Sequence, residues 1–599
     1  MLKKTIAVGN SSFVLMRMRN CFYVDKTPYI KRLIESGSFV QLITRPRRFG
    51  KSLFLDTLRT YLAVNPANPE DVSRQKVLFE NLAIAEDAEF CRTYMGRVPV
   101  FFLSMKGFTG PSFSYALGKI CKKIAAAVNE YSYLLESPRL TDNEKGTLQD
   151  YFALNSSSLL ADERRAWLTA SSFLPDILYC LTKHFGRPAM LLIDEYDVPL
   201  EKAASSGYYA EMRNFIRDFL SVLKPEDVPL AGGLPVLEKA VLTGCLRVSK
   251  ESIFTGVNNF SVNTVCSTNE NLAASIGFTE DEVKKLLNYY GLADRSKDVK
   301  AWYDGYRFGS SEIYSPWDVL SFCQDALASN DAKTAEPDNY WINTSSNDAI
   351  DEFLGFLTEE DAGRMQTLLD GGSIELNINE QLTYSDFVQH KSEDFWTLLL
   401  FTGYLTVDKY LGGKNYLLRI PNEEIRQTFR SRVSARFSSQ NAAFAAHGIK
   451  LAEAAVTGNA SRMAEVLEPL LRTYVSVRDS ATRAPAENYY HGFLSALFAC
   501  AGSRIQDFRS NAESGNGYAD IIFSSGSGPD RCGVVIEIKR AARQEDLPDA
   551  VDEALRQVDK KDYSEALRRI RCSKYFAYGI AFCGKTCEVG GGELKQIAR

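Results

Sequence analysis

The segment TRPRRFGKSL, residues 44–53, contains the residue types of a phosphate-binding loop. In such a loop Lys51 would reach the β and γ phosphates of a nucleotide, and the hydroxyl of Ser52 would hold Mg²⁺. Gly50 would allow the backbone to approach the phosphates closely. Arg45 stands where these loops carry their first glycine. The motif alone therefore also fits a basic turn that caps a helix.

The residues on either side of this segment favour the nucleotide site. GSFVQLIT (37–44) has the composition of a short strand, and KSLFLDTLRTYLA (51–63) has apolar residues at helical spacing. A strand, a tight turn and a helix are the context in which backbone N–H groups converge on an anion. We therefore expect the nucleotide contacts to come from consecutive loop and helix residues, namely Arg47, Arg48, Phe49, Gly50, Lys51, Ser52 and Leu53.

An acidic strand end follows further along the chain, in PAMLLIDEYDVPL (188–200). The apolar run before Asp194 is typical of a buried parallel strand that presents acids at its carboxyl end. Asp194 would then contact the Mg²⁺ shell, and Glu195 would polarise the attacking water. The alternative is a buried strand that ends at a solvated acidic turn. This alternative is less favoured because a strand, the Gly-Lys-Ser segment and a helix precede it in the chain.

Two further strand candidates complete this pattern, RVPVFFLSM (97–105) and the start of KAVLTGCLRVSKESIFTGVNNF (239–260). A strand inserted between the phosphate loop and the acidic strand, then a polar-tipped strand, is the order of the ATPase branch that places a catalytic glutamate beside the Mg²⁺ aspartate. Thr243 could sense the γ-phosphate. Arg247 could stabilise transition-state charge or serve as a structural ion-pair partner.

A second group of chemically active residues lies near the C-terminus. GYADIIFSS (517–525) and CGVVIEIKRA (532–541) are apolar strands separated by a turn-rich loop. Because side chains alternate along a strand, Glu537 and Lys539 share one face, and Asp520 on the neighbouring strand could lie beside them. Asp520 and Glu537 would hold Mg²⁺, and Lys539 would position or activate a water for attack on a phosphodiester.

The elements around this group predict a restriction-endonuclease-like fold. A helix (487–501), the strand RIQDFRS (504–510), the two strands above, a long helix (547–570) and a last strand (575–584) follow one another. Further candidate residues are Glu487, Glu513 and Gln557, with an ordinary helix-surface role as the alternative for Glu487 and Gln557. His491 fits a packed histidine better than a catalytic base.

Several motifs resemble a known family. FYVDKTPYIKRLI (22–34), TRPRRFGKSLFLDTL (44–58), LLIDEYDVPL (191–200), LTGCLRVSKESIFTGVNNF (242–260) and WYDGYRFG (302–309) closely resemble the AAA-ATPase-like proteins of bacteria, which often carry a C-terminal nuclease-like module. The resemblance implies a nucleotide site whose loop has arginines in place of the first glycine. Asp520, Glu537 and Lys539 resemble the PD-(D/E)XK nuclease signature, although Ala519 stands where that signature has proline.

We predict an α/β chain of four parts. They are a P-loop ATPase domain with a parallel sheet (1–277), a helix-rich, winged-helix-like lid and middle domain (278–440), a helical connector (441–484) and a restriction-endonuclease-like α/β domain (485–599). The winged-helix prediction rests on a hairpin pattern around Gly412 and Gly413 (403–422). Tyr303, Tyr306, Trp317 and Trp341 in the middle region fit core packing better than base stacking.

Composition narrows the class of protein. No segment approaches the ~20 apolar residues of a membrane span, and polar residues interrupt any secretory core at the N-terminus, so we expect a cytoplasmic protein. The 12 cysteines form no paired Cys-x-x-Cys ligand sets, and the chain has only four histidines, so a structural zinc site is not expected. The formal net charge of -5 shows that the protein is not basic overall, but it does not exclude a local basic groove that binds nucleic acid.

The sequence as a whole predicts an ATP-dependent enzyme that processes nucleic acid, with DNA as the expected partner and ATP and Mg²⁺ as cofactors. ATP hydrolysis near the N-terminus would drive or regulate a nuclease near the C-terminus. The alternative is a nucleotide-gated switch that binds a protein partner and has an inactive nuclease-like domain. A third interpretation is a homo-oligomeric ring that remodels nucleoprotein without cleavage.

Overall fold

The computed structural model divides the chain into two compact units. One unit comprises residues 1–346 and 373–426, and the other comprises residues 347–372 and 427–599. Within them the structure describes residues 3–155, 162–224, 229–247, 260–329, 335–341, 359–369, 371–380, 382, 384, 392–429, 442–474, 486–514, 517–526, 531–560 and 572–594.

The first unit is built on a sheet in the strand order β2-β3-β6-β1-β7. Its strands are β1 (Val40–Thr44), β2 (Val100–Ser104), β3 (Ala189–Asp194), β6 (Leu237–Gly244) and β7 (Phe260–Asn263). All neighbouring pairs are parallel, so the carboxyl ends of the strands lie at one edge of the sheet. Every residue of β1 and β3 is buried, as expected for parallel strands covered on both faces.

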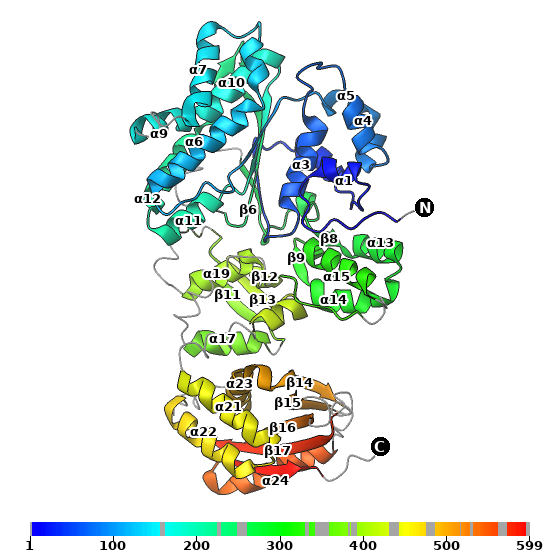
Figure 1. Cartoon of the computed structure of the whole chain (residues 1–599), viewed down its shortest axis with the longest axis vertical. Coiled ribbons are helices and arrows are strands. Elements are labelled where there is room, and N and C mark those ends of the chain that lie inside the picture. The colour runs from blue at the N-terminus through cyan, green and yellow to red at the C-terminus, as the bar shows by residue number, and fades with distance from the viewer. Residues whose placement is uncertain are drawn as a thin grey trace. The chain divides into compact units, whose positions relative to one another are not determined.

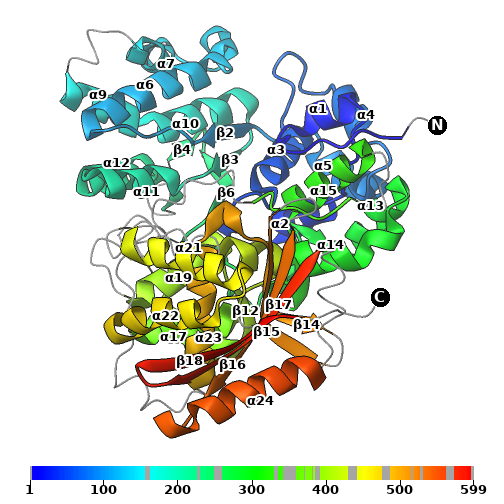
Figure 2. The same ribbon diagram turned by 60° about the horizontal axis from the view of Figure 1, so that its bottom comes forward.

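Two groups of helices flank this sheet (Figures 1 and 2). On one side α3, which begins directly after the phosphate loop, lies with α1, α4 and α5, and on the other side are α6, α7, α9 and α10. The helices of this part are α1 (Phe13–Met18), α2 (Pro28–Glu35), α3 (Lys51–Leu62), α4 (Ser73–Phe79), α5 (Ala88–Tyr94), α6 (Phe113–Asn129), α7 (Asp142–Phe152), α9 (Glu163–Ser171), α10 (Phe173–Phe185), α11 (Val198–Ser206) and α12 (Tyr209–Phe219).

The rest of the first unit contains two small antiparallel sheets. The first has the order β8-β10-β9 and the second the order β11-β13-β12, in which β12 and β13 form the predicted hairpin around Gly412 and Gly413. Helix α19 ends at Thr402, because Gly403 adopts a φ of +95° and the chain then enters β12. The elements are β8 (Phe278–Thr279), α13 (Glu280–Tyr290), α14 (Ser296–Tyr303), β9 (Tyr306–Phe308), β10 (Ser311–Tyr314), α15 (Pro316–Ala328), β11 (Ile374–Asn377), α19 (Ser392–Thr402), β12 (Thr406–Gly412) and β13 (Asn415–Arg419).

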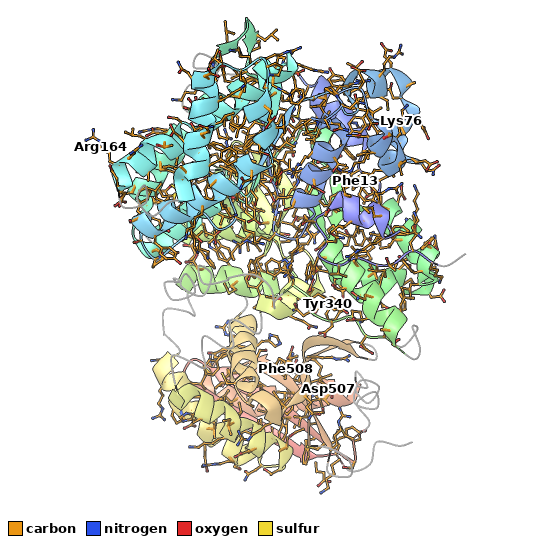
Figure 3. All side chains as sticks on the ribbon, turned by 45° about the horizontal axis from the view of Figure 1, so that its top comes forward. Phe13, Lys76, Arg164, Tyr340, Asp507 and Phe508 are labelled. Carbon is orange, nitrogen blue, oxygen red and sulfur yellow. The ribbon has the colours of Figure 1, made fainter. Side chains whose placement is uncertain are left out.

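The second unit contains a mixed sheet in the order β14-β15-β16-β17-β18, in which β16 and β17 are parallel and the other pairs antiparallel. Apolar side chains of α21, α22 and α23 pack on one face of it, and α24 packs on the other, so that side chains fill the space between the layers (Figure 3). The elements are α17 (Glu359–Leu369), α21 (Ala442–Val456), α22 (Ala460–Tyr474), α23 (Ala486–Ala499), β14 (Gln506–Ser514), β15 (Gly517–Ser525), β16 (Cys532–Arg540), α24 (Leu547–Lys560), β17 (Lys574–Cys583) and β18 (Thr586–Glu593).

The predicted α/β fold class is confirmed: a parallel sheet lies in the first unit and a mixed sheet in the second. The helices α21 and α22, predicted as a connector, contribute Leu451, Met463 and Leu467 to the core of the C-terminal sheet. The long helix predicted for 547–570 is α24 up to Lys560, and residues 561–570 lie outside the described part of the chain. Among the described helices, none has the length and apolar character needed to cross a bilayer.

Candidate active sites

The phosphate loop (residues 44–52) makes a sharp turn between β1 and α3. Arg48 and Gly50 both have positive φ angles, +75° and +99°, and Gly50 is the N-cap of α3. A non-glycine residue in this conformation is strained and persists where its surroundings hold it. The backbone thus turns within a few residues and directs the first N–H groups of α3 toward the carboxyl edge of the sheet.

Lys51 is the first residue of α3 and is 7% exposed. Its Nζ donates hydrogen bonds to the carbonyl oxygens of Arg45 and Pro46, each at 2.8 Å. Its Nζ also lies 3.8 Å from the sulfur of Cys245, which follows β6. The ammonium group therefore lies inside the turn, where the predicted phosphates would be bound.

Two of the predicted site residues, Ser52 and Thr243, donate hydrogen bonds to the carboxylate of a third, Asp194. Asp194, at the end of β3, accepts a hydrogen bond from Ser52 Oγ at 2.5 Å and from Thr243 Oγ1 at 2.6 Å. The parallel register places Ile193 beside Leu242, which brings the ends of β3 and β6 together. Carboxylate and hydroxyl oxygens are the hard ligands that Mg²⁺ prefers, so these side chains fit the cation that a nucleotide site requires.

Glu195 lies directly beyond this carboxylate and has a φ of +54°. Burial raises the pKa of its side chain, as does the negative charge of Asp194, whereas the positive charges of Lys106 and Lys51 act in the opposite direction. Lys123 on α6 is close enough for its charge to interact with Glu195. A raised pKa makes a carboxylate a better proton acceptor, as a residue that activates water must be.

Arg45 contributes its side chain to the protein interior. The guanidinium is 0% exposed and donates to the carbonyl oxygens of Thr44 and Asn263 and to Asn263 Oδ1, at 2.5 to 3.0 Å. Its carbon lies 4.6 Å from the centre of the Phe308 ring, and burial lowers the pKa of Arg45 to about 9. The arginine that replaces the first glycine thus fixes the loop to β7, a role that the sequence did not indicate.

The other loop residues predicted to contact nucleotide have protein partners. Arg47 Nη2 forms an ion pair with Glu201 Oε2 at 2.8 Å, and Arg48 Nη1 donates to the Tyr340 carbonyl at 3.0 Å. The ring of Phe49 is buried, with Tyr306 edge-on at 4.9 Å, so a contact with nucleotide would come from its backbone. Leu53, in the first turn of α3, is half-buried.

The chain after β6 forms a turn that depends on Asp197, an acid that was not predicted as a site residue. Asp197 accepts the N–H groups of Cys245 and Leu246 at 2.8 and 2.9 Å and the hydroxyl of Tyr384 at 3.3 Å. Arg247 follows this turn, and its Nε is buried with no hydrogen-bond partner among the described residues. Asp197 lies only three residues after Asp194, in the same acidic segment, but its partners are distant in the sequence.

The second predicted site combines two neighbouring strands. In the register of β15 and β16 Ile521 lies beside Ile536, which brings Asp520 next to Glu537. Asp520 Oδ2 accepts the Ile538 N–H at 2.7 Å, and Lys539 Nζ lies 3.9 Å from Glu537 Oε1. Glu537 is 2% exposed. The structure therefore brings the three residues of the predicted nuclease signature together.

The donor set of this second site fits Mg²⁺, which is commonly bound by one or two carboxylates together with waters and phosphate oxygens. Among the described residues, no cluster of three or more histidine, cysteine, aspartate or glutamate side chains could hold a metal. The side chains of the predicted candidates Glu487 and Glu513 lie outside the described part of the chain. Gln557 is half-buried on α24.

His491 belongs to the structure around this site. It is buried, and its Nε2 lies 2.8 Å from the carbonyl oxygen of Asp520. Since one ring nitrogen is engaged with the backbone, the packed role favoured from the sequence agrees with its position.

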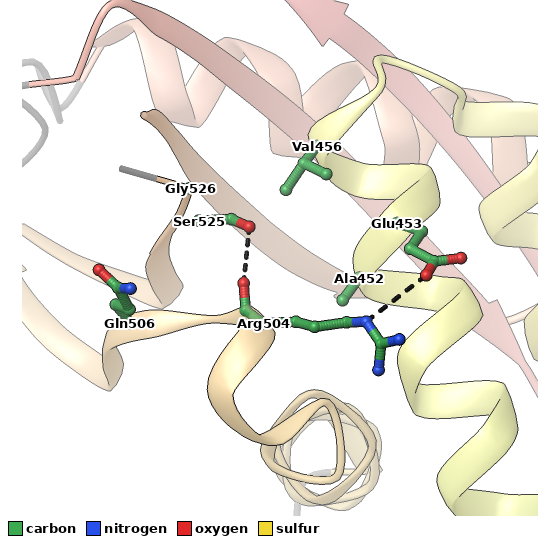
Figure 4. A pocket seen from close by; sticks show the side chains of 7 residues that line it. All are labelled: Ala452, Glu453, Val456, Arg504, Gln506, Ser525 and Gly526. Atoms are coloured by element: carbon green, nitrogen blue, oxygen red, sulfur yellow. Dashed lines mark hydrogen bonds and ion pairs between the residues drawn. The ribbon is translucent and has the colours of Figure 1, made fainter. Parts of the chain in front are cut away.

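A cavity of about 330 Å³ in the second unit is separate from these residues (Figure 4). It is lined by Ala452 and Glu453 of α21, by Arg504, and by Ser525 and Gly526 at the far end of β15 from Asp520. Arg504 forms an ion pair with Glu453 at 3.6 Å, and both side chains are more than half exposed. None of the predicted catalytic residues lines this cavity.

Comparisons with known proteins agree with the division into two sites. Residues 7–254 match the family described as predicted AAA-ATPase, and residues 485–591 match the PD-(D/E)XK nuclease superfamily. An uncharacterized protein in vnfD 5'region from Azotobacter chroococcum mcd 1 is 27% identical over 448 residues, which cover 73% of this chain and 71% of that protein. The chain thus combines an AAA-ATPase-like domain with a C-terminal PD-(D/E)XK nuclease superfamily domain, as the resemblance predicted.

Proposed function

We propose that the protein binds and hydrolyses ATP at its phosphate loop and uses the nucleotide cycle to control a Mg²⁺-dependent nuclease that acts on DNA. The observation that carries the ATP part is the meeting of Ser52 and Thr243 on the two oxygens of Asp194, beside Lys51. The adjacent Asp520, Glu537 and Lys539 support the nuclease part.

In the ATP site the chain's residues divide the work. Lys51 would exchange the carbonyls of Arg45 and Pro46 for phosphate oxygens, which are stronger acceptors because they are charged. Ser52 and Asp194 would hold Mg²⁺, whose charge stabilises the phosphates when it is bound. Glu195 would accept the proton of the water whose oxygen attacks the γ-phosphorus, while the bond to the ADP oxygen breaks.

In the nuclease site Asp520 and Glu537 would hold Mg²⁺, which supplies positive charge to the phosphodiester when bound. Lys539 would hold the attacking water by a hydrogen bond and stabilise the developing negative charge. The oxygen of this water forms the new bond to phosphorus as the bond to the sugar oxygen breaks, and the proton that the water gives up to solvent is balanced by the one that the departing sugar oxygen takes up. A site on two adjacent strands needs no other element to align these three groups.

We further propose a cytoplasmic location. None of the twelve cysteines forms a disulfide, which agrees with a reducing compartment.

A substrate panel tests the proposed nuclease. The full-length protein is incubated with ATP and linear duplex, circular duplex, single-stranded DNA or RNA, with Mg²⁺ or with EDTA. We expect Mg²⁺-dependent cleavage of at least one DNA substrate. If the protein cleaves only RNA, the proposed substrate is RNA and not DNA. No cleavage of any substrate, with ATP still hydrolysed, would contradict the nuclease and favour the nucleotide-gated switch.

A further inference from the structure

Arg48 connects the phosphate loop to a segment almost three hundred residues away. Its Nη1 donates to the carbonyl of Tyr340 at 3.0 Å, and its guanidinium lies over the Trp317 ring at 4.2 Å from the centre (Tyr340 is labelled in Figure 3). Arg47, the neighbouring residue, instead pairs with Glu201 on α11. Two consecutive arginines of the loop are thus held by different parts of the chain.

The partners of Arg48 rest on a pair of buried acids. Asp318 and Glu424 are each 1% exposed, and the charge of Arg48 interacts with both. Glu424 Oε1 accepts the N–H groups of Tyr340 and Trp341 at 2.6 and 2.8 Å. Each carboxyl group influences the pKa of the other, so the two acids are neighbours. Glu424 therefore holds the backbone to which Arg48 is attached.

The acid pair carries little negative charge, so the phosphates of a nucleotide could compete with it for the guanidinium of Arg48. Burial raises the pKa of Asp318 and of Glu424, so the pair keeps a proton under conditions in which isolated carboxyl groups would both be ionised. The pair thus offers Arg48 less negative charge than the phosphates of a nucleotide would. Arg48 lies three residues before Lys51 and holds a φ of +75°, a conformation that its contacts must maintain.

We propose that Arg48 is a latch, which ties the phosphate loop to residues 335–341 when no nucleotide is bound and releases them when phosphates compete for its guanidinium. The latch rests on the proposed nucleotide site at Lys51. It would make the segment around Tyr340 the part of the chain that reports whether nucleotide is bound.

Hydrogen exchange of the Tyr340 and Trp341 amides in the full-length protein tests the latch. Both amides donate to Glu424, so they should exchange slowly without nucleotide. A non-hydrolysable ATP analogue with Mg²⁺ should accelerate their exchange about tenfold, which corresponds to the loss of one charge-assisted hydrogen bond. Binding of the analogue is measured in parallel by a fluorescent derivative.

Three variants separate the latch from a general loosening of the loop. Arg48→Ala should show the fast exchange without nucleotide and no further increase with it. Arg48→Lys, which keeps the charge but cannot spread a planar group over Trp317, should exchange at an intermediate rate. Arg47→Ala, the matched control in the same loop, should leave the two amides at the parental rate when no nucleotide is present.

The outcomes distinguish the latch from the nucleotide site itself. If the analogue binds and the two amides exchange as before, the latch is wrong and the nucleotide site stands. If Arg48→Ala and Arg48→Lys both exchange as slowly as the parent without nucleotide, the latch is also wrong. If the parent binds no nucleotide at all, the proposed function fails, and the latch fails with it.

Discussion

The two candidate sites are assembled in opposite ways. The ATP site draws Lys51, Asp194 and Thr243 from three segments spread over almost two hundred residues, and strand order alone brings them together. The nuclease site draws Asp520, Glu537 and Lys539 from adjacent strands within twenty residues. The first site should therefore depend on distant packing contacts, whereas the second should depend on local register and on the charges themselves.

The largest effect is expected when a negative charge is removed from the candidate nuclease site. Glu537→Gln keeps the shape of the side chain but removes the negative charge that would hold Mg²⁺, so DNA cleavage should fall about 10³-fold. Initial rates of cleavage measure this. The matched control is Glu545→Gln, an exposed acid beyond the end of β16 that pairs with Arg543, and it should cleave at the parental rate. Parental cleavage by a folded Glu537→Gln protein would place the activity elsewhere.

The second effect concerns nucleotide binding at the candidate ATP site. Lys51→Ala removes the ammonium group from the turn, so the affinity for ATP should fall about 100-fold, or ~2.7 kcal/mol. Titration with a fluorescent ATP derivative measures the affinity. Lys76→Ala, which removes an exposed lysine on α4, should bind ATP as the parent does. Unchanged affinity in Lys51→Ala would mean that the nucleotide, if bound, lies at another site.

Arg45 tests whether the ATP site depends on packing contacts. Arg45→Met leaves Asn263 Oδ1 and the buried carbonyl groups of Thr44 and Asn263 without their donor, so the free energy of unfolding of the first unit should fall by about 2 kcal/mol. Denaturant unfolding followed by fluorescence gives this value. Arg97→Met removes a surface ion pair with Glu70, whose side chain is 83% exposed, and should change stability by no more than ~0.5 kcal/mol. Equal losses in the two variants would contradict the role of Arg45 in fixing the loop to β7.

The smallest effect depends on pH. Burial raises the folded-state pKa of Glu424, so the folded protein keeps a proton that the unfolded chain releases, and stability should fall as pH rises above the ordinary glutamate pKa. Arg48, Asp318, Tyr303, Tyr306 and Tyr340 are the titratable groups whose charges act on Glu424 or on its partner Asp318. Glu424→Gln cannot ionise, and its amide could still accept the two N–H groups.

Stability relative to the parent should therefore rise in Glu424→Gln between pH 5 and 8, by about 1 to 2 kcal/mol. Unfolding curves across that range measure the difference. Glu423→Gln, the neighbouring acid that pairs with Arg426, is the matched control and should show no such trend. A flat difference for Glu424→Gln would mean that the buried acid is ionised in the folded state.

The proximity of Asp520, Glu537 and Lys539 could be predicted because the signal has the period of a strand. Alternation alone placed Glu537 and Lys539 on one face, and the register of β15 with β16 then brought Asp520 beside Glu537. The last strand, β18, was missed because TCEVGGGE contains three glycines, which weaken any strand pattern. These glycines fit close contacts, since a Cβ on Gly590 would lie 2.5 Å from Val551 on α24.

In the candidate ATP site, only the residues that belong to sequence motifs were predictable. Gly-Lys-Ser and the acidic strand end indicated Lys51, Ser52 and Asp194 as candidates, but no local pattern could indicate that Arg45 would extend into the core toward β7. The partners of Arg48 and Asp197 are also distant in the sequence, so only the fold could bring them together. Residues that belong to a recognisable motif were predictable, whereas residues whose role depends on a distant partner outside any motif were not.

ATP dependence of DNA cleavage tests the central claim, that the two sites work together. Cleavage by the parent, Lys51→Ala and Lys539→Ala proteins is measured with Mg²⁺, with and without ATP. We predict that ATP accelerates cleavage by the parent, that Lys51→Ala loses this acceleration, and that Lys539→Ala hydrolyses ATP without cutting. Cleavage by the parent at the same rate with and without ATP would contradict the coupling of the two sites.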